Sequence, residues 1–218
     1  MNNIFDLKSL EKKAFRATHQ DGLRDIYMGG VVISMAVLAY SEASNAFPLV
    51  RFSLFLLGLG TAYLILWAGK KYITTPRLGQ VKFGTVRQRR KRTLVMVMSG
   101  IVFVQVVILI GTIFLWKNPQ WAMRLGFGQT NQDMERLVVA VIGALLVDPS
   151  IALIAYFNDF MRGYYYAFIV SLGVFSLIWF GNPIYLIAAG LLIIVPGVIL
   201  FVRFLRTHPL PPTEVTHG

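Results

Sequence analysis

The sequence predicts an all-α integral membrane protein, a bundle of six transmembrane helices arranged as three hairpins. Two observations lead to this fold class. Hydrophobic residues make up 56% of the 218-residue chain and charged residues only 14%, a balance far from that of soluble domains. Several apolar runs also reach the roughly 20 residues that a helix needs to cross a hydrocarbon core of about 30 Å. The chain therefore supports one membrane domain, with little left over for a soluble one.

The expected elements follow from the positions of these apolar runs. Residues 1–25 are predicted as a cytoplasmic amphipathic segment lying in the membrane interface. Six spans are expected at residues 26–40, 47–68, 94–116, 137–157, 163–180 and 183–205. The last two share a charge-free stretch, and Gly181-Asn182-Pro183 supplies the turn between them. Residues 206–218 are predicted as a flexible cytoplasmic tail.

The cytoplasmic loop expected at residues 70–92 fixes the orientation of the bundle. It carries nine Lys and Arg residues and no Asp or Glu. With both termini inside, seventeen of the 21 Lys and Arg residues lie on the inner side and the other four lie outside. Because positive charge concentrates on the cytoplasmic side of membrane proteins, we expect cytoplasmic termini. The location predicted is the plasma membrane, which is the inner membrane of a bacterial cell.

A basic run closes this loop: Arg87, Arg89, Arg90, Lys91 and Arg92. We expect it to set topology and to contact anionic lipid head groups, since each basic residue near such a surface contributes about 1 kcal/mol. A docking surface for an acidic protein is the alternative. Nucleic acid is not expected, because no aromatic stacking residues accompany the run. The first half of the loop, residues 72–86, mixes turn residues with alternating apolar ones and predicts a short strand or hairpin.

Asp148 is the one ionisable side chain near the middle of a predicted span. A charge at that depth is costly and usually faces the bundle interior, which makes it a candidate functional residue. Pro149 follows it and removes a backbone N–H. Gln105 lies at nearly the same depth in the preceding span, so a neutral Asp148 hydrogen-bonded to Gln105 would be structural. A proton or cation site, and exposure through local distortion, are the alternatives. The same helix row holds small residues suited to close packing: Ala140, Ala144 and Ala152.

A polar pattern recurs where the first and fifth spans enter the membrane. Asp, Arg and Tyr follow one another at three-residue intervals, as Asp21, Arg24 and Tyr27 and as Asp159, Arg162 and Tyr165. A parallel internal repeat, as found in some transporters, would produce this pattern. Ordinary helix capping would produce it too, because Asp favours helix N-termini and pairs with Arg three residues on.

The chain offers little for catalysis. It has no Cys and three scattered His residues, so we expect no metal, no cofactor and no thiol chemistry. HExxH, GxSxG and Walker sequences are absent from it. The one dense polar cluster at an interface is Asp159, Arg162 and the three tyrosines at 164–166, which is more typical of an aromatic belt than of an active site.

Two segments within the first 90 residues resemble the signature of a known family. They are residues 19–26, HQDGLRDI, and residues 73–83, ITTPRLGQVKF. Both resemble a family of small, uncharacterised bacterial polytopic membrane proteins. The resemblance implies membrane class and bacterial origin, and it implies no activity.

Three hypotheses for function follow. The first is a non-catalytic accessory or assembly subunit or membrane scaffold, bound to anionic lipids and acting as a homo-oligomer or within a larger membrane complex. The second is a small transporter or channel with a proton or cation site at Asp148. The third is an interfacial lipid-modifying enzyme. A hydrated cavity reaching Asp148, rather than a dry contact with Gln105, would favour the second hypothesis over the first.

Overall fold

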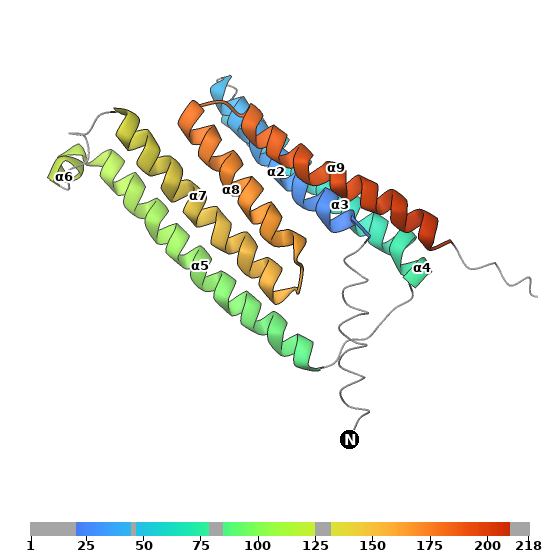
Figure 1. Ribbon diagram of the computed structural model, residues 1–218. Coiled ribbons are helices and arrows are strands. Elements are labelled where there is room, and N and C mark those ends of the chain that lie inside the picture. The colour runs from blue at the N-terminus through green and yellow to red at the C-terminus, as the bar shows by residue number, and fades with distance from the viewer. Residues whose placement is uncertain (1–20, 45–46, 79–84, 125–131, 210–218) are drawn as a thin grey trace, which may run out of the picture. The chain divides into compact units, whose positions relative to one another are not determined.

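A computed structural model describes residues 21–44, 47–78, 85–124 and 132–209 (Figure 1). These residues are helical apart from short connections, and no strand occurs among them. Six helices in this part of the chain are long and apolar enough to cross a membrane, which confirms the predicted fold class at that level. The predicted amphipathic segment up to residue 20 and the tail from residue 210 lie outside the described residues.

Each expected span corresponds to one long helix. In chain order the helices are α2 (Leu23–Ala43), α3 (Pro48–Ala68), the π-helix η1 (Gly69–Thr74), α4 (Thr75–Leu78), α5 (Thr85–Lys117), α6 (Pro119–Arg124), α7 (Gln132–Phe157), α8 (Arg162–Phe180) and α9 (Ile184–Thr207). The chain divides into two compact units. The first contains described residues 21–78 and 187–209, and the second contains described residues 85–186.

Glycines bring α2 and α9 into backbone contact in the first unit. A Cβ on Gly22 would overlap the carbonyl oxygen of Gly197, and a Cβ on Gly29 would lie 2.7 Å from the carbonyl oxygen of Gly190. Gly22 also has a φ of 73°, a left-handed conformation that favours glycine. The order of these pairs shows that α2 and α9 run antiparallel. The start of α2 and the C-terminal half of α9 therefore lie at the same end of this unit.

The third long helix of the first unit, α3, packs along α2 (Figure 1). Small residues again allow the two helices to approach closely. A Cβ on Gly30 would lie 3.0 Å from the Cβ of Ala62. A Cβ on Gly58 would lie 2.5 Å from the Oγ of Ser34. Close backbone approach through small residues is how helices gain packing energy in lipid, where apolar side chains have no reason to leave their surroundings.

In the second unit α7 packs closely on α8 and makes a smaller contact with α5. Ala140 is fully buried, and the carbonyl of Ala144 accepts a hydrogen bond of 2.9 Å from the Oγ of Ser171. Ala144 of the predicted small-residue row thus lies at the α7–α8 contact. The helices α5 and α7, predicted to pair as a hairpin, therefore contact each other much less than α7 contacts α8.

The turn predicted between the fifth and sixth spans is present. Gly181 ends α8 with a φ of 66°, and the backbone N–H of Ile184 donates a hydrogen bond of 3.0 Å to the Oδ1 of Asn182. Residues beyond the turn, from Ile187 on, belong to the first unit while α8 belongs to the second.

The strand or hairpin predicted over residues 72–86 is wrong for every described residue of that range. The chain continues from α3 as η1 and α4 up to Leu78, and α5 begins at Thr85. Residues 79–84 lie outside the described part. A helix satisfies its backbone groups internally, so a chain leaving the hydrocarbon core loses nothing by remaining helical. Pro76 is the second residue of α4, where its missing N–H is tolerated.

The basic run expected in the loop is helical as well. Residues 87–92 form the beginning of α5, which continues without a break to Lys117. Arg, Lys and Gln are good helix formers, which explains why a run rich in like charges still forms a helix. The loop predicted at 70–92 is thus largely two helical extensions of neighbouring spans.

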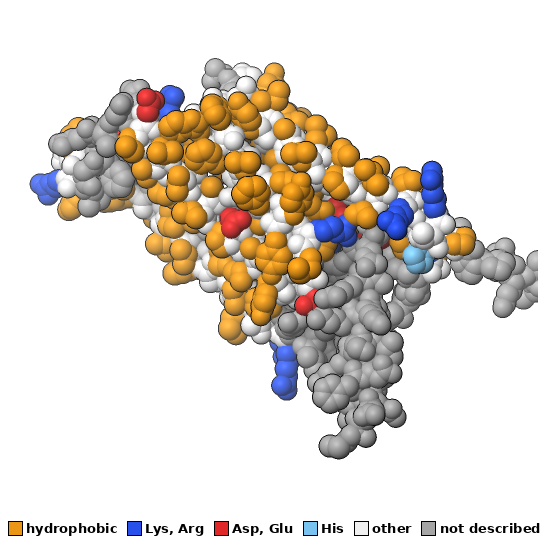
Figure 2. Space-filling view, in the orientation of Figure 1, with side chains coloured by type: hydrophobic (Ala, Val, Ile, Leu, Met, Phe, Trp, Pro, Cys, Tyr) orange, Lys and Arg blue, Asp and Glu red, His pale blue; other side chains and the backbone are white. Residues whose placement is uncertain are grey.

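The surface of both units is dominated by apolar side chains. Figure 2 shows hydrophobic side chains over most of the visible face. Leu57, Val95 and Phe103 are each more than 60% exposed. Soluble monomers rarely present contiguous apolar surface of this extent, whereas lipid-facing helices require it.

The close contact between α2 and α9 predicts that an added methyl group lowers stability at some glycines and not at others. Gly29→Ala would place a methyl group 2.5 Å from the Cγ1 of Ile194 and 2.7 Å from a carbonyl oxygen. We expect a loss of about 1–3 kcal/mol of stability, the usual cost of overpacking, and a lower midpoint of thermal unfolding in detergent. Gly60→Ala is the matched control, since nothing lies within 4 Å of its added methyl group. Equal midpoints for the two variants would contradict the close α2–α9 packing.

Candidate functional site

A buried ion pair joins the start of α2 to the end of α3. The carboxylate of Asp21 is fully buried, and its Oδ2 accepts hydrogen bonds from the Nζ of Lys70 at 2.7 Å and from the Oγ1 of Thr74 at 2.9 Å. Lys70 keeps a third of its side chain exposed, while Thr74 is 4% exposed. The Oδ1 of Asp21 accepts no hydrogen bond from the described residues. Lys70 and Thr74 therefore supply the hydrogen bonds that the carboxylate of Asp21 accepts.

The π-helical segment η1 presents both donors to Asp21. The hydrogen bond i→i+5 of a π-helix widens the turn, and such turns are frequent at functional sites. Here the carbonyl of Lys70 accepts from the backbone N–H of Thr75 and, at 2.7 Å, from its Oγ1. Gly69 begins the segment, and a Cβ there would lie 2.7 Å from the side chain of Leu23. The end of α3 is thus packed directly on the first residue of α2.

Further charges surround this pair. Asp25, one turn along α2, is fully buried, and its Cβ lies 2.8 Å from where a Cβ on Gly197 would be. Arg24 interacts electrostatically with both Asp21 and Asp25. The site is therefore a compact charged network between α2, η1 and α9, and we call Asp21, Arg24, Asp25, Lys70 and Thr74 the boundary network.

The boundary network joins residues 19–26 to residues 73–83. Asp21 belongs to residues 19–26 and Thr74 to residues 73–83, and their side chains form a hydrogen bond. Neither segment by itself predicts this contact. The spacing of Asp21, Arg24 and Tyr27 predicts helix capping or a repeat, which depend on neighbouring residues alone.

Neither Asp21 nor Asp159 occupies the N-cap of the helix that follows it, whereas the pairing of Asp with Arg three residues on is present electrostatically for Asp21 and Arg24. The residue at the N-cap of α2 is Gly22 and that of α8 is Met161, and neither N-cap makes a side-chain hydrogen bond. The two Asp residues also differ in setting, since Asp21 is fully buried whereas Asp159 is half-buried with a φ of 51°. The remaining residues of the pattern are intermediate in burial or exposed: Arg24, Tyr27, Arg162 and Tyr165.

Asp148 and Gln105 are not brought together by a hydrogen bond. The Nε2 of Gln105 lies 3.2 Å from the carbonyl oxygen of Leu146 and 3.3 Å from the Oγ of Ser150. Residues 146 and 150 lie one turn apart on α7, on either side of the Pro149 position that lacks an N–H. Asp148 itself is half-buried. Gln105 therefore ties α5 to α7, and the predicted structural pair with Asp148 is replaced by this contact.

The side chains of Arg89 and Arg92 are both exposed at the beginning of α5. No acidic residue occurs in the first turn of this helix. Each exposed basic residue near a membrane surface attracts anionic head groups by about 1 kcal/mol. This end of α5 is consequently suited to an anion.

The aromatic cluster at the start of α8 is partly buried. Tyr166 is 1% exposed, its ring lies 5.8 Å from that of Phe160, and the guanidinium of Arg162 lies 5.3 Å from the centre of the Phe160 ring. Tyr164 and Tyr165 are exposed. Only these two thus have the exposure that the predicted interfacial belt requires, while Tyr166 belongs to the core.

Comparisons with protein-family models, with curated proteins and with solved structures found no match to this chain.

The boundary network predicts unequal effects of removing two adjacent lysines. Lys70→Met removes the ammonium bonded to the buried carboxylate of Asp21, which then keeps only Thr74 and the electrostatic interaction with Arg24. We expect a loss of about 2 kcal/mol, below the 3–5 kcal/mol of a fully buried pair because Lys70 is partly exposed. Lys71→Met is the control, since Lys71 is exposed and its ammonium lies 4.7 Å from the centre of the Trp67 ring.

Adding Asp21→Asn to Lys70→Met should restore part of the loss, because the unpaired charge is then removed. Thermal unfolding in detergent compares all three variants with the wild-type chain. If Lys70→Met and Lys71→Met unfold at the same temperature, the ion pair does not hold α2 to α3.

Proposed function

We propose that this chain is a non-catalytic integral membrane protein of the bacterial plasma membrane, an accessory subunit or scaffold that presents a basic helix end to anionic lipids at the cytoplasmic face. Its family relationship would be to the small bacterial polytopic membrane proteins that residues 19–26 and 73–83 resemble. Three observations support the proposal. The basic run is continuous with the α5 helix, positive charge concentrates on one side of the predicted membrane, and the boundary network bonds side chains within one unit.

The observation that carries the proposal is the continuity of α5. Because the basic run and the span are one helix from Thr85 to Lys117, the run stays at a fixed height above the hydrocarbon core. Arg89 and Arg92 extend from it into solvent. An anionic head group there would compensate the basic side chains.

Charge and packing support the orientation. Seventeen of the 21 Lys and Arg residues share one side of the membrane if both termini are cytoplasmic. The antiparallel pairing of α2 with α9 through Gly22 and Gly197 is consistent with this, since it brings the start of α2 and the last turns of α9 to the same end of their unit.

The boundary network supports a structural rather than a transporting role. Its central carboxylate binds side chains of the same unit, and the adjoining glycine contact leaves no space for a side chain between α2 and α9. The dry contact of Gln105 with Asp148 that would favour the scaffold is not formed among the described residues, because Gln105 contacts Leu146 and Ser150. The preference for a scaffold therefore rests on the boundary network and on the start of α5.

Selective retention of anionic lipid tests this proposal. The Arg89→Gln, Arg92→Gln double variant removes two charges at the start of α5, and Lys117→Gln, Arg124→Gln removes two at the opposite end of the helix and in α6. We purify each from membranes of phosphatidylethanolamine and phosphatidylglycerol and measure the lipid retained. At about 1 kcal/mol per charge, the first variant should retain phosphatidylglycerol about 25-fold less strongly, and less so at high salt.

The second variant should retain phosphatidylglycerol like the wild-type chain. Equal retention by all three proteins would contradict the proposal. Proton flux into proteoliposomes that Asp148→Asn abolishes would favour the transporter in its place.

A further inference from the structure

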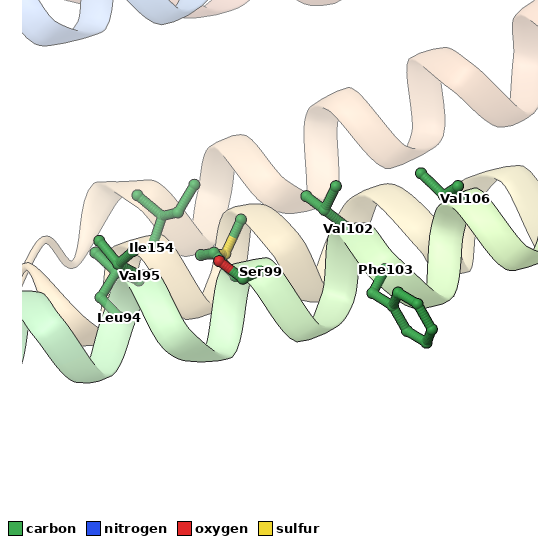
Figure 3. A pocket seen from close by; sticks show the side chains of 8 residues that line it. Leu94, Val95, Ser99, Val102, Phe103, Val106 and Ile154 are labelled. Carbon is green, nitrogen blue, oxygen red and sulfur yellow. The ribbon is translucent and has the colours of Figure 1, made fainter.

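A shallow apolar groove runs along α5 in the second unit (Figure 3). The space over it is about 730 Å³ and is open on the outer side. Seven of its lining residues come from α5 and one, Ile154, from α7. All but one are apolar: Leu94, Val95, Met98, Ser99, Val102, Phe103, Val106 and Ile154. The groove therefore has the character of a site for a hydrocarbon chain.

One end of the groove adjoins the basic beginning of α5. Arg92, whose side chain is exposed, precedes Val95 by three residues, so the two lie on the same side of the helix. The lining residues extend from Leu94 to Val106, which is about 18 Å of helix at 1.5 Å per residue. Half of a hydrocarbon core of about 30 Å is about 15 Å. The groove thus covers the depth of one leaflet and begins at its charged surface.

We propose that this groove binds one anionic phospholipid of the cytoplasmic leaflet, with the phosphate at Arg92 and an acyl chain along the row from Val95 to Val106. This inference rests on the proposed function for the orientation of α5 and for its preference for anionic lipid. It goes further in assigning a discrete site with a fixed number of bound molecules. General attraction of anionic lipid to a basic surface requires no groove.

Charge complementarity favours a phospholipid over a second copy of the chain. Two copies joined by a twofold axis along the membrane normal would bring their α5 helices together in parallel. Their basic beginnings would then lie side by side at the same depth and repel each other. A phospholipid carries its negative charge at the one depth where the groove is flanked by positive charge, and it carries hydrocarbon where the groove is apolar.

The test compares two valines on opposite faces of α5. Val102 lines the groove and is 50% exposed, whereas Val104, two residues on, is 53% exposed and does not line it. Val102→Trp should fill the groove, and Val104→Trp adds the same volume to the other face. The full chain, reconstituted with phosphatidylethanolamine and phosphatidylglycerol and released into detergent, is weighed intact to count bound lipids, and size-exclusion chromatography checks each variant for folding.

The wild-type chain and Val104→Trp should each retain one phosphatidylglycerol, and Val102→Trp should retain at least tenfold less. Arg92→Gln should lower the retention of phosphatidylglycerol about fivefold and leave that of phosphatidylethanolamine unchanged.

Equal retention by the two Trp variants overturns the groove site. The proposed function survives that result if the Arg89→Gln, Arg92→Gln variant still loses its anionic preference, and it fails as well if no variant loses it. A wild-type mass of two chains that Val102→Trp reduces to one would show that a second copy occupies the groove, which also overturns the lipid site.

Discussion

The ion pair of Lys70 with Asp21 is the interaction on which the first unit depends. A carboxylate removed from water must be compensated locally, because an unpaired buried charge costs several kcal/mol. Asp21 lies just before the first residue of α2, and its partners lie on the segment that extends α3. The two helices are consequently fixed at the end where they would otherwise separate. Lys70 can serve this role because its long stem lets the ammonium reach Asp21 while part of the side chain remains exposed.

Glycine on α9 allows this helix to pack closely against the start of α2, beside the charged network. Gly197 lies against Gly22 and against the Cβ of Asp25, so any larger residue there would push α9 away from the network. Close packing lowers access of water to the charged groups, and low access strengthens their mutual attraction. The charged network and the glycine contact are therefore two parts of one constraint, which holds α2, η1 and α9 together at one end of the unit.

Hydropathy was sufficient to predict the class of the protein and its six spans, because each span is a long apolar run and the runs are separated by charged or turn residues. The side chains that bond to Asp21 and to Gln105 could not be predicted from hydropathy. Asp21 and Lys70 are 49 residues apart, and no local pattern in either segment indicates the other. Gln105 and Asp148 do share a depth, yet depth does not specify which side of a helix a residue occupies. Residues 146 and 150 present their groups to Gln105 and residue 148 does not.

The prediction of a strand over residues 72–86 failed for a related reason. Alternating apolar residues in a short segment are a weak signal, and the covalent continuity of the segment with two transmembrane helices outweighs it. Thr74 and Thr75, which favour strands by propensity, instead use their hydroxyl groups on Asp21 and on the carbonyl of Lys70. Tertiary hydrogen bonds of this kind are invisible in a pattern read along one segment.

The orientation of the chain is the central claim, and labelling of single cysteines tests it most directly. The chain has no Cys, so each variant carries one thiol. Ser44→Cys lies in the connection after α2, and Met161→Cys lies before α8, both at exposed positions. In intact cells a membrane-impermeant maleimide should label Ser44→Cys and should label Met161→Cys only after the membrane is opened. Labelling of Met161→Cys in intact cells, with Ser44→Cys protected, would contradict the account.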